Sequence, residues 1–391
     1  MHSRNLQSLA AFLARCVVAG LAAAFVLSVL APGLVGRLRG TPAGGTAPRA
    51  STAGPVSYAD AVAHASPSVV NIYANRVTVT RPAYAVSDPF NQRVLGYAIG
   101  PARQRRYQNL GSGVIFSADG YVLTNNHVIA GADDIQVLLD DGSVAQAQVT
   151  GTDAETDLAV LKIDGTDLPA IDIADGGDAD VGDVVLAIGN PAGFGKTVTM
   201  GIVSATGRQL NLSRYEDFIQ TDAAINAGNS GGALVNARGE LIGINTAVYN
   251  TPISAGAGKA PEMPEGIGFA IPVATAKAVL DQIIKHGHVI RGWIGADYTD
   301  IPAPRGASVR QPGVLVSRVV PDSPAAQAKL QPGDILLRID GAVIANEADL
   351  LNREAAFAPG TKVRVEGLRG NQPFSLDVVL AQRPAPSTTG A

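Results

Sequence analysis

A serine in a glycine-rich stretch is the feature of the sequence that first suggests catalysis. The stretch "AGNSGGAL", residues 227–234, places Ser230 between small and flexible residues. Glycine on both sides lets the backbone turn sharply and brings successive N–H groups close to an outside atom. A serine hydroxyl is a weak nucleophile at neutral pH, so catalysis by Ser230 requires a base, usually histidine, and a carboxylate that orients the base.

The candidate base is His127, in "YVLTNNHVIAGAD", because it ends a predicted strand within the β-rich part of the chain. A packed or capping histidine is the alternative, and the glycine-flanked serine favours the base. For the carboxylate, Asp157 stands at the entrance to the predicted strand "LAVLKI", but spacing alone leaves the choice open. The aspartates between His127 and Ser230 that we considered are Asp133, Asp134, Asp153, Asp157 and Asp164.

Short strands separated by turn signals predict the elements that must position these side chains. Their spacing between about residues 110 and 272 favours an all-β sandwich or a pair of barrels. The segment 273–288 has apolar residues at three- and four-residue spacing and predicts a helix that closes this domain. Residues 81–110 look too irregular for a core element, and we expect Arg103, Arg105 and Arg106 to lie on a solvated loop.

The C-terminal part of the chain predicts a second, smaller unit. From residue 289 onward, four short β patterns alternate with two helical ones, and residues 384–391 look disordered. With 391 residues, 46% of them hydrophobic, the chain has room for two or three domains.

Charge and residue usage exclude several classes of function. A net charge of −4 with 16% charged residues provides no basic field, so nucleic acid is not an expected partner. Because the chain has one cysteine, Cys16, it forms no intramolecular disulfide. The histidines are scattered, and His286 and His288 are better explained as residues that cap a helix than as ligands, so we expect no metal site and no cofactor.

The N-terminal region predicts a membrane anchor. Residues 16–36 carry no charge, and about 21 residues at roughly 1.5 Å each are long enough to cross the hydrocarbon core. A cleaved signal peptide is the alternative, although Pro32 directly after Ala31 makes a poor cleavage context. Residues 1–15 would form a short end and residues 37–57 a flexible linker; the positive charges on both sides do not decide the orientation.

Six sequence blocks resemble those of the HtrA-type serine proteases and occur in the same order: "TNNHVIAGAD", "ETDLAVLKID", "LAIGNP", "TDAAINAGNSGGALVN", "LIGINTA" and "EGIGFAIP". The resemblance implies a mainly β fold, with a chymotrypsin-like double β-barrel over residues 58–288. It also implies that His127 is the general base, that Asp157 orients it and that Ser230 attacks the peptide carbonyl. The backbone N–H groups of Gly228, Asn229 and Ser230 would form the oxyanion hole.

The same resemblance indicates how substrate would bind. Ala224, six residues before the nucleophile, stands where trypsin-type proteases hold an aspartate. With Ile225 beside it, we expect the substrate to have a small apolar residue directly before the cleaved bond. We expect the Asp222 side chain to point away from the pocket for that residue. The segment formed by Thr246, Ala247 and Val248 would pair with the substrate backbone as an added strand. Asn229 cannot pair with a newly cut N-terminal ammonium, so activation by N-terminal cleavage is not expected.

Residues 289–383 resemble one PDZ domain of the permuted bacterial kind. Its carboxylate-binding loop would be "GWIGADY", in which the backbone N–H groups of Trp293, Ile294, Gly295 and Ala296 could capture a peptide C-terminus. Ala296 is smaller than the usual aliphatic residue there. The alternative is a structural β-rich module without a ligand.

One PDZ domain with a membrane anchor resembles the DegS-like branch of this family. The branch implies a homotrimer in the bacterial inner membrane with the catalytic part in the periplasm. It also implies activation by C-termini of misfolded outer-membrane proteins and cleavage of a membrane-bound anti-sigma factor. Residues 204–222 would be the sensor loop, with Arg208 in the switch. The alternatives are a general periplasmic quality-control protease or chaperone and a non-catalytic peptide-binding adaptor.

Overall fold

The computed structural model describes residues 57–86, 96–99, 101–174, 179–190, 195–210, 213–226, 228–246, 266–301 and 311–384. Residues from Ser57 onward form one compact unit. The predicted N-terminal end, anchor, most of the linker and almost all of the C-terminal tail lie outside the described residues. Among the helices that are described, none is long and apolar enough to span a membrane.

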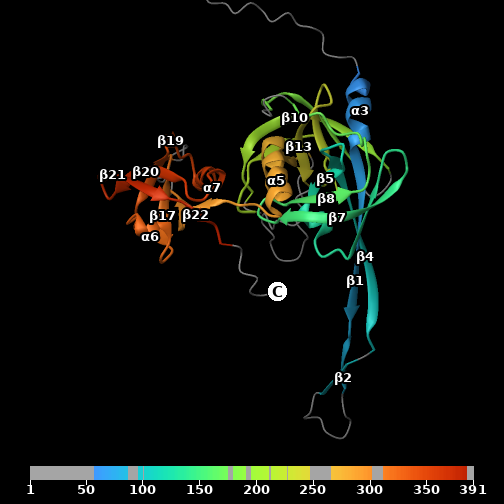
Figure 1. The fold of residues 1–391 in the computed structure, drawn as a ribbon, viewed down its shortest axis with the longest axis horizontal. Helices are drawn as coiled ribbons and strands as arrows, with labels where there is room; N and C mark the ends of the chain where they lie inside the picture. Colours follow the sequence, from blue (N-terminus) through green and yellow to red (C-terminus); the bar gives the residue numbers. More distant parts are fainter. Residues whose placement is uncertain are drawn as a thin grey trace, which may run out of the picture. The chain divides into compact units, whose positions relative to one another are not determined.

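The first barrel contains the predicted strand before His127. It closes in the order β1-β4-β5-β8-β7-β6, and Figure 1 shows it in colours from blue (β1) through teal to green (β7 and β8). The strand β8, "LAVLKI", is buried at five of its six positions, because both of its neighbours and the barrel interior cover it. The bounds are β1 Val69–Thr80, β4 Arg103–Ile115, β5 Tyr121–Asn125, β6 Asp134–Leu138, β7 Val144–Asp153 and β8 Leu158–Ile163.

The second barrel carries the serine loop. It closes in the order β10-β11-β14-β13-β12-β9, with β13 buried throughout. The bounds are β9 Val184–Gly189, β10 Thr197–Arg208, β11 Phe218–Thr221, β12 Ala233–Asn236, β13 Leu241–Thr246 and β14 Gly268–Pro272. One apolar core contains residues of both barrels, among them Leu123, Leu158, Ile188 and Ile244. The prediction of paired β-barrels is therefore confirmed.

A long β-ribbon replaces the irregular loop predicted for residues 81–110. The strands β1 and β4 pair without interruption from Val69↔Val114 to Thr80↔Arg103, and β2 (Ala83–Val86) pairs with β3 (Gly96–Ile99) beyond them. Figure 1 shows this ribbon running out from the barrel. Arg103 and Arg105 are exposed but belong to β4. The prediction was wrong because the outer part of the ribbon has no buried face, so its sequence lacks the alternation that marks a strand.

Short helices flank the barrels. The N-terminal side has α3 (Ala59–Ala65), a 3₁₀ turn (Ser66–Ser68) and, after β5, α4 (Asn126–Ile129). The predicted closing helix is α5 (Val273–His286), whose buried residues pack into the shared core. It ends at Gly287, which adopts φ 77° and donates its N–H to the Ile283 carbonyl, an arrangement that favours glycine.

The C-terminal unit has its own core around a sheet of order β16-β17-β18-β20-β21, with β19 paired to β18. Asn346 caps α7, because its side chain accepts the Asp349 N–H, and Ser323 caps α6 in the same way. The bounds are β15 Gly292–Trp293, β16 Ala296–Asp300, β17 Val314–Val319, α6 Pro324–Gln327, β18 Ile335–Ile339, β19 Ala342–Val343, α7 Glu347–Ala356, β20 Lys362–Arg369, β21 Gln372–Val379 and β22 Ala381–Gln382.

Candidate active site

His127 and Asp157 are joined by two hydrogen bonds. The imidazole Nδ1 lies 2.6 Å from Asp157 Oδ2, and the His127 backbone N–H donates to Asp157 Oδ1 over 2.9 Å. The carboxylate therefore sets both the ring and the backbone of the histidine. With Nδ1 bonded to the carboxylate as a donor, Nε2 is left as the acceptor that a general base needs.

The backbone of Asp157 is held in an unusual conformation. Asp157 has φ 57°, in the left-handed region that non-glycine residues rarely adopt. Its carbonyl accepts the Asn126 N–H and the Asn125 side-chain amide, each over 3.0 Å. The Thr246 hydroxyl lies 3.5 Å from Asp157 Oδ2. These bonds connect the turn before β8 to the end of β5 and the start of α4, which carries His127, and to β13 of the second barrel.

The loop that carries Ser230 packs against the strand end that leads to His127. A Cβ atom added at Gly231, which has φ 82°, would collide with the Ser112 carbonyl and the Thr124 hydroxyl, and would lie 3.2 Å from Asn125 N. Glycine is therefore required for this close approach. Ser230 itself is 4% exposed, and its carbonyl accepts the Ser112 N–H over 2.8 Å. The structure thus brings the serine loop within contact of residues two and three positions before His127.

The three expected oxyanion donors differ in their hydrogen bonding. The Asn229 N–H donates to the Asn226 carbonyl over 3.0 Å, so it turns back into its own loop. Gly228 has φ 100°, a conformation that favours glycine. Of the three expected donors, we therefore propose the N–H groups of Gly228 and Ser230 for an oxyanion hole, with Asn229 supporting the loop through its bond to Asn226.

The expected substrate-binding residues are described in part. Ala224 is exposed and Ile225 half-buried at the edge of the serine loop. The Ala224 carbonyl accepts the hydroxyl of Thr199 over 2.8 Å. Asp222 faces elsewhere, as predicted, since its carboxylate accepts the Ile202 N–H over 2.7 Å. Thr246 ends β13, whereas Ala247 and Val248 lie outside the described residues.

In the candidate peptide-binding loop of the C-terminal unit, one expected donor already has an internal acceptor. The Ile294 N–H donates to Glu354 Oε1 over 2.7 Å, and the Tyr298 hydroxyl donates to Glu354 Oε2 over 3.1 Å. Burial raises the pKa of Glu354 to about 7 and raises the pKa of Tyr298 well above its usual value. Of the four residues expected to capture a carboxylate, Trp293 lies in β15, Gly295 directly precedes β16, and Ala296 is the first residue of β16, where it pairs with Val319.

Arg208, which we expected to take part in the switch, is the last residue of β10 in the sensor segment. Its guanidinium donates to the Gln220 side chain over 2.9 Å, across β10 and β11. The contacts with α7 come instead from its neighbours in the chain. The Asn352 amide donates to the Glu216 carbonyl over 3.0 Å, and the Gln209 amide donates to Asn346, the N-cap of α7, over 3.3 Å.

A buried ion pair also joins the two parts. Arg291, 8% exposed at the start of the C-terminal unit, forms two hydrogen bonds with Asp153, 6% exposed at the end of β7. Its guanidinium stacks 4.4 Å from the centre of the Tyr215 ring. Arg383 bonds to the Tyr215 hydroxyl and to Glu155, each over 3.1 Å. Asp153 lies four residues before Asp157, so this cluster is connected to the Asp157 carboxylate by one short turn.

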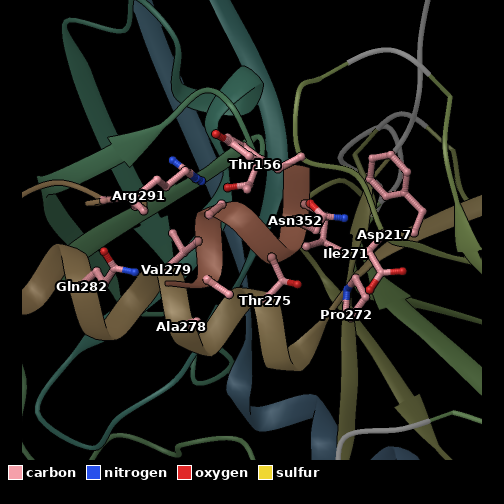
Figure 2. Close-up of a pocket in the computed structure, with 15 residues that line it drawn as sticks. Thr156, Asp217, Ile271, Pro272, Thr275, Ala278, Val279, Gln282, Arg291 and Asn352 are labelled. Carbon is pink, nitrogen blue, oxygen red and sulfur yellow. The ribbon is translucent and has the colours of Figure 1, made fainter. Parts of the chain in front are cut away.

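A pocket adjoins these contacts. In Figure 2, α7 with Asn352 lies across α5, whose residues Thr275, Ala278, Val279 and Gln282 face the pocket. Thr156 and Arg291 line one side of it and Asp217 the other. Burial, reinforced by the charge of Asp349, raises the pKa of Asp217.

Sequence reasoning missed the residues that join elements distant in the chain, namely Ser112, Asp153, Tyr215, Arg291, Asn352 and Glu354. No local motif marks them, because their partners are set by tertiary packing. One signal was available: an arginine or glutamate in an otherwise apolar segment must find a partner when it is buried. In the described part of the chain, no group of three or more histidine, cysteine or acidic side chains could hold a metal ion.

Comparisons with known proteins agree with this architecture. The trypsin-like peptidase domain family matches residues 111–244, and the PDZ domain family matches residues 292–380. The serine endoprotease DegS of Escherichia coli K12 is 42% identical over 337 residues, which cover 85% of this chain and 87% of DegS. A probable periplasmic serine endoprotease, DegP-like, of Pseudomonas putida W619 is 45% identical over 72% of this chain, but this match spans only 58% of that longer relative.

Solved structures are similar over the same region. The HtrA-type protease AlgW with a decapeptide is 47% identical, with a TM-score of 0.66 over 85% of this chain and 100% of AlgW. The serine endoprotease from Yersinia pestis is 41% identical, with a TM-score of 0.60 over 84% of this chain and 99% of that one.

Proposed function

Since this chain belongs to the HtrA-type serine endoproteases, we propose that Ser230 is its nucleophile and that His127 and Asp157 complete a catalytic triad. The observation that supports this most strongly is the double hydrogen bond between His127 and Asp157 next to the serine loop. His127 would accept the Ser230 proton as the hydroxyl attacks the peptide carbonyl, and would return it to the leaving amine.

The chain acts, in this proposal, as a periplasmic protease that is activated when a peptide C-terminus binds the PDZ domain. Two features support the coupling. The α7 helix carries Glu354, which bonds to the candidate peptide-binding loop, and Asn352, which bonds to the sensor segment at Glu216. The Arg291–Asp153 ion pair lies one turn from Asp157. The similar protease AlgW has been solved with a decapeptide, which is consistent with peptide binding in a relative.

The membrane location, oligomeric state, substrate and activator that we propose are those of the DegS-like branch. The chain would be held in the bacterial inner membrane by residues 16–36, assemble as a homotrimer and cleave the periplasmic part of a membrane-bound anti-sigma factor after a small apolar residue. C-termini of misfolded outer-membrane proteins would be the activators. The single PDZ domain and the high coverage of DegS, 87%, favour this branch over the longer DegP-like relatives.

The test uses the full chain in detergent and its Ser230→Ala variant, with two substrates: the anti-sigma periplasmic domain and unfolded casein. Cleavage of the first substrate that depends on Ser230 and rises at least tenfold with an apolar C-terminal peptide supports the regulated protease. Cleavage of both substrates regardless of peptide indicates general quality control instead. Equal behaviour of the two proteins would leave only the non-catalytic adaptor.

A further inference from the structure

Ser112 is a fully buried polar residue in which every hydrogen-bonding group has a partner. Its hydroxyl donates to the Gly228 carbonyl over 2.7 Å and accepts the Asn190 N–H over 3.0 Å. Its backbone N–H donates to the Ser230 carbonyl, and its backbone carbonyl accepts the Thr124 hydroxyl over 2.7 Å. Ser112 belongs to β4 of the first barrel, whereas Gly228 and Ser230 lie in a loop of the second barrel.

Three consecutive carbonyl groups of the serine loop have fixed partners, and Ser112 supplies two of these. It binds the carbonyls of Gly228 and Ser230, and the Gly232 N–H binds the Asn229 carbonyl over 2.9 Å. In a trans peptide the C=O and the following N–H point in opposite directions. The bond to the Asn229 carbonyl therefore fixes the direction of the Ser230 N–H, and the bond to the Gly228 carbonyl fixes that of the Asn229 N–H.

The Gly228–Asn229 peptide needs a hydrogen bond from outside the loop, such as the one from the Ser112 hydroxyl. Glycine at φ 100° has no Cβ to restrict its backbone, so the loop has more alternative conformations at this point than at any neighbour with a side chain. An oxyanion hole is effective only when its donors already point to the position where the negative charge develops. Removal of the Ser112 hydroxyl would leave the Gly228 carbonyl and the Asn190 N–H buried without that partner.

We propose that Ser112 is a positioning residue of the oxyanion hole: its hydroxyl holds the Gly228–Asn229 peptide and its backbone N–H holds the Ser230–Gly231 peptide, so that the Asn229–Ser230 peptide between them directs the Ser230 N–H at the substrate oxyanion. It does not touch substrate. Because Ser112 also receives the Thr124 hydroxyl, three residues before His127, it fixes the distance between the base and the oxyanion donors across the two barrels. This inference rests on the proposed role of Ser230.

The test compares Ser112→Ala with Ser117→Ala in the full chain. Ser117 is a matched control, because its hydroxyl accepts the Tyr121 N–H in the turn at the other end of the same β4–β5 hairpin. The readouts are kcat and KM on a chromogenic peptide and the affinity of a peptide boronic acid, which forms a tetrahedral adduct with the serine. Ser112→Ala should lower kcat about 10- to 100-fold, a smaller loss than that of a direct donor, with KM within threefold, and should weaken the boronate in parallel.

If Ser112 had only a structural role, Ser112→Ala would lower the thermal stability but leave the ratio of boronate affinity to KM as in the wild-type protein. Unchanged kcat and boronate affinity in folded Ser112→Ala would therefore overturn the inference. If Ser112→Ala does not fold, Ser112→Cys decides, since it keeps the volume with a weaker donor: reduced boronate affinity supports the inference and wild-type affinity rejects it. Labelling of the wild-type protein by a fluorophosphonate distinguishes failure of the Ser112 inference from failure of the proposed function. If Ser230 is not labelled, Ser230 is not the nucleophile.

Discussion

Asp157 holds His127 through both carboxylate oxygens, one on the ring Nδ1 at 2.6 Å and one on the backbone N–H at 2.9 Å. Asp157 thus fixes the backbone of His127 as well as its ring. This arrangement connects the start of α4 with the turn before β8, and its hydrogen bonds hold Asp157 at φ 57°.

Asp157→Asn should lower kcat by about 10⁴, because an amide stabilises the wrong tautomer of the imidazole while preserving the geometry. The measurement is kcat on a peptide substrate, with circular dichroism as a check on folding. Asp133→Asn is the control, since that carboxylate accepts only the Val77 N–H in the hydrogen bonds described for it. Equal losses in the two variants would contradict the role of Asp157.

Cleavage should favour valine or alanine before the scissile bond over lysine or arginine by at least about 10-fold in kcat/KM, the usual scale for differences within an apolar pocket. Ala224 offers no charge, and the Asp222 carboxylate is already bonded to the Ile202 N–H. A peptide library analysed by mass spectrometry measures this preference. A preference for basic residues would show that another acidic side chain reaches the pocket.

Arg291→Met should reduce the ratio of activity with peptide to activity without peptide towards one. The substitution leaves Asp153 buried without its cation, so the free energy of unfolding should also fall by about 3–5 kcal/mol. Arg238→Met is the control, because Arg238 is 71% exposed in its pair with Glu240, and such pairs contribute little. An Arg291→Met protein with a normal peptide response would exclude this ion pair from the coupling.

The PDZ domain should lose stability as the pH rises through neutrality. Glu354 has a pKa of about 7 in the folded protein against 4.5 for the free group. The stabilisation by its proton is therefore complete below about pH 4.5 and is lost as the pH rises through about 7, a change of about 3 kcal/mol. Urea unfolding followed by Trp293, the one tryptophan in the chain, measures this domain.

Glu354→Gln should remove that pH dependence, because the amide oxygen still accepts the Ile294 N–H but does not ionise in this range. Glu366→Gln on β20 serves as the comparison and should keep the wild-type dependence. If the Glu354→Gln curve retains the full slope between pH 5 and 8, another group is responsible for it.

The sequence predicted the barrels and the closing helix because strand length, turn residues and apolar spacing are local properties. The assignments of His127 and Ser230 were also favoured from residue types alone, whereas Asp157 required the family resemblance. The ribbon of β1 and β4 was missed because an exposed strand pair has no apolar alternation. Contacts such as Asn352 with Glu216, 136 residues apart in the chain, depend on how the domains pack and leave no local pattern.

In our proposal, Ser230 is a nucleophile whose reactivity rises when a peptide binds the PDZ domain. The most direct measurement is the rate at which a fluorophosphonate labels the full chain, with and without a peptide that ends in an apolar carboxylate, followed by mass spectrometry of the labelled residue. We expect a single adduct on Ser230, no label in Ser230→Ala, and a labelling rate that rises at least tenfold with peptide. A label on another residue, or a rate that ignores the peptide at saturation, would contradict the account.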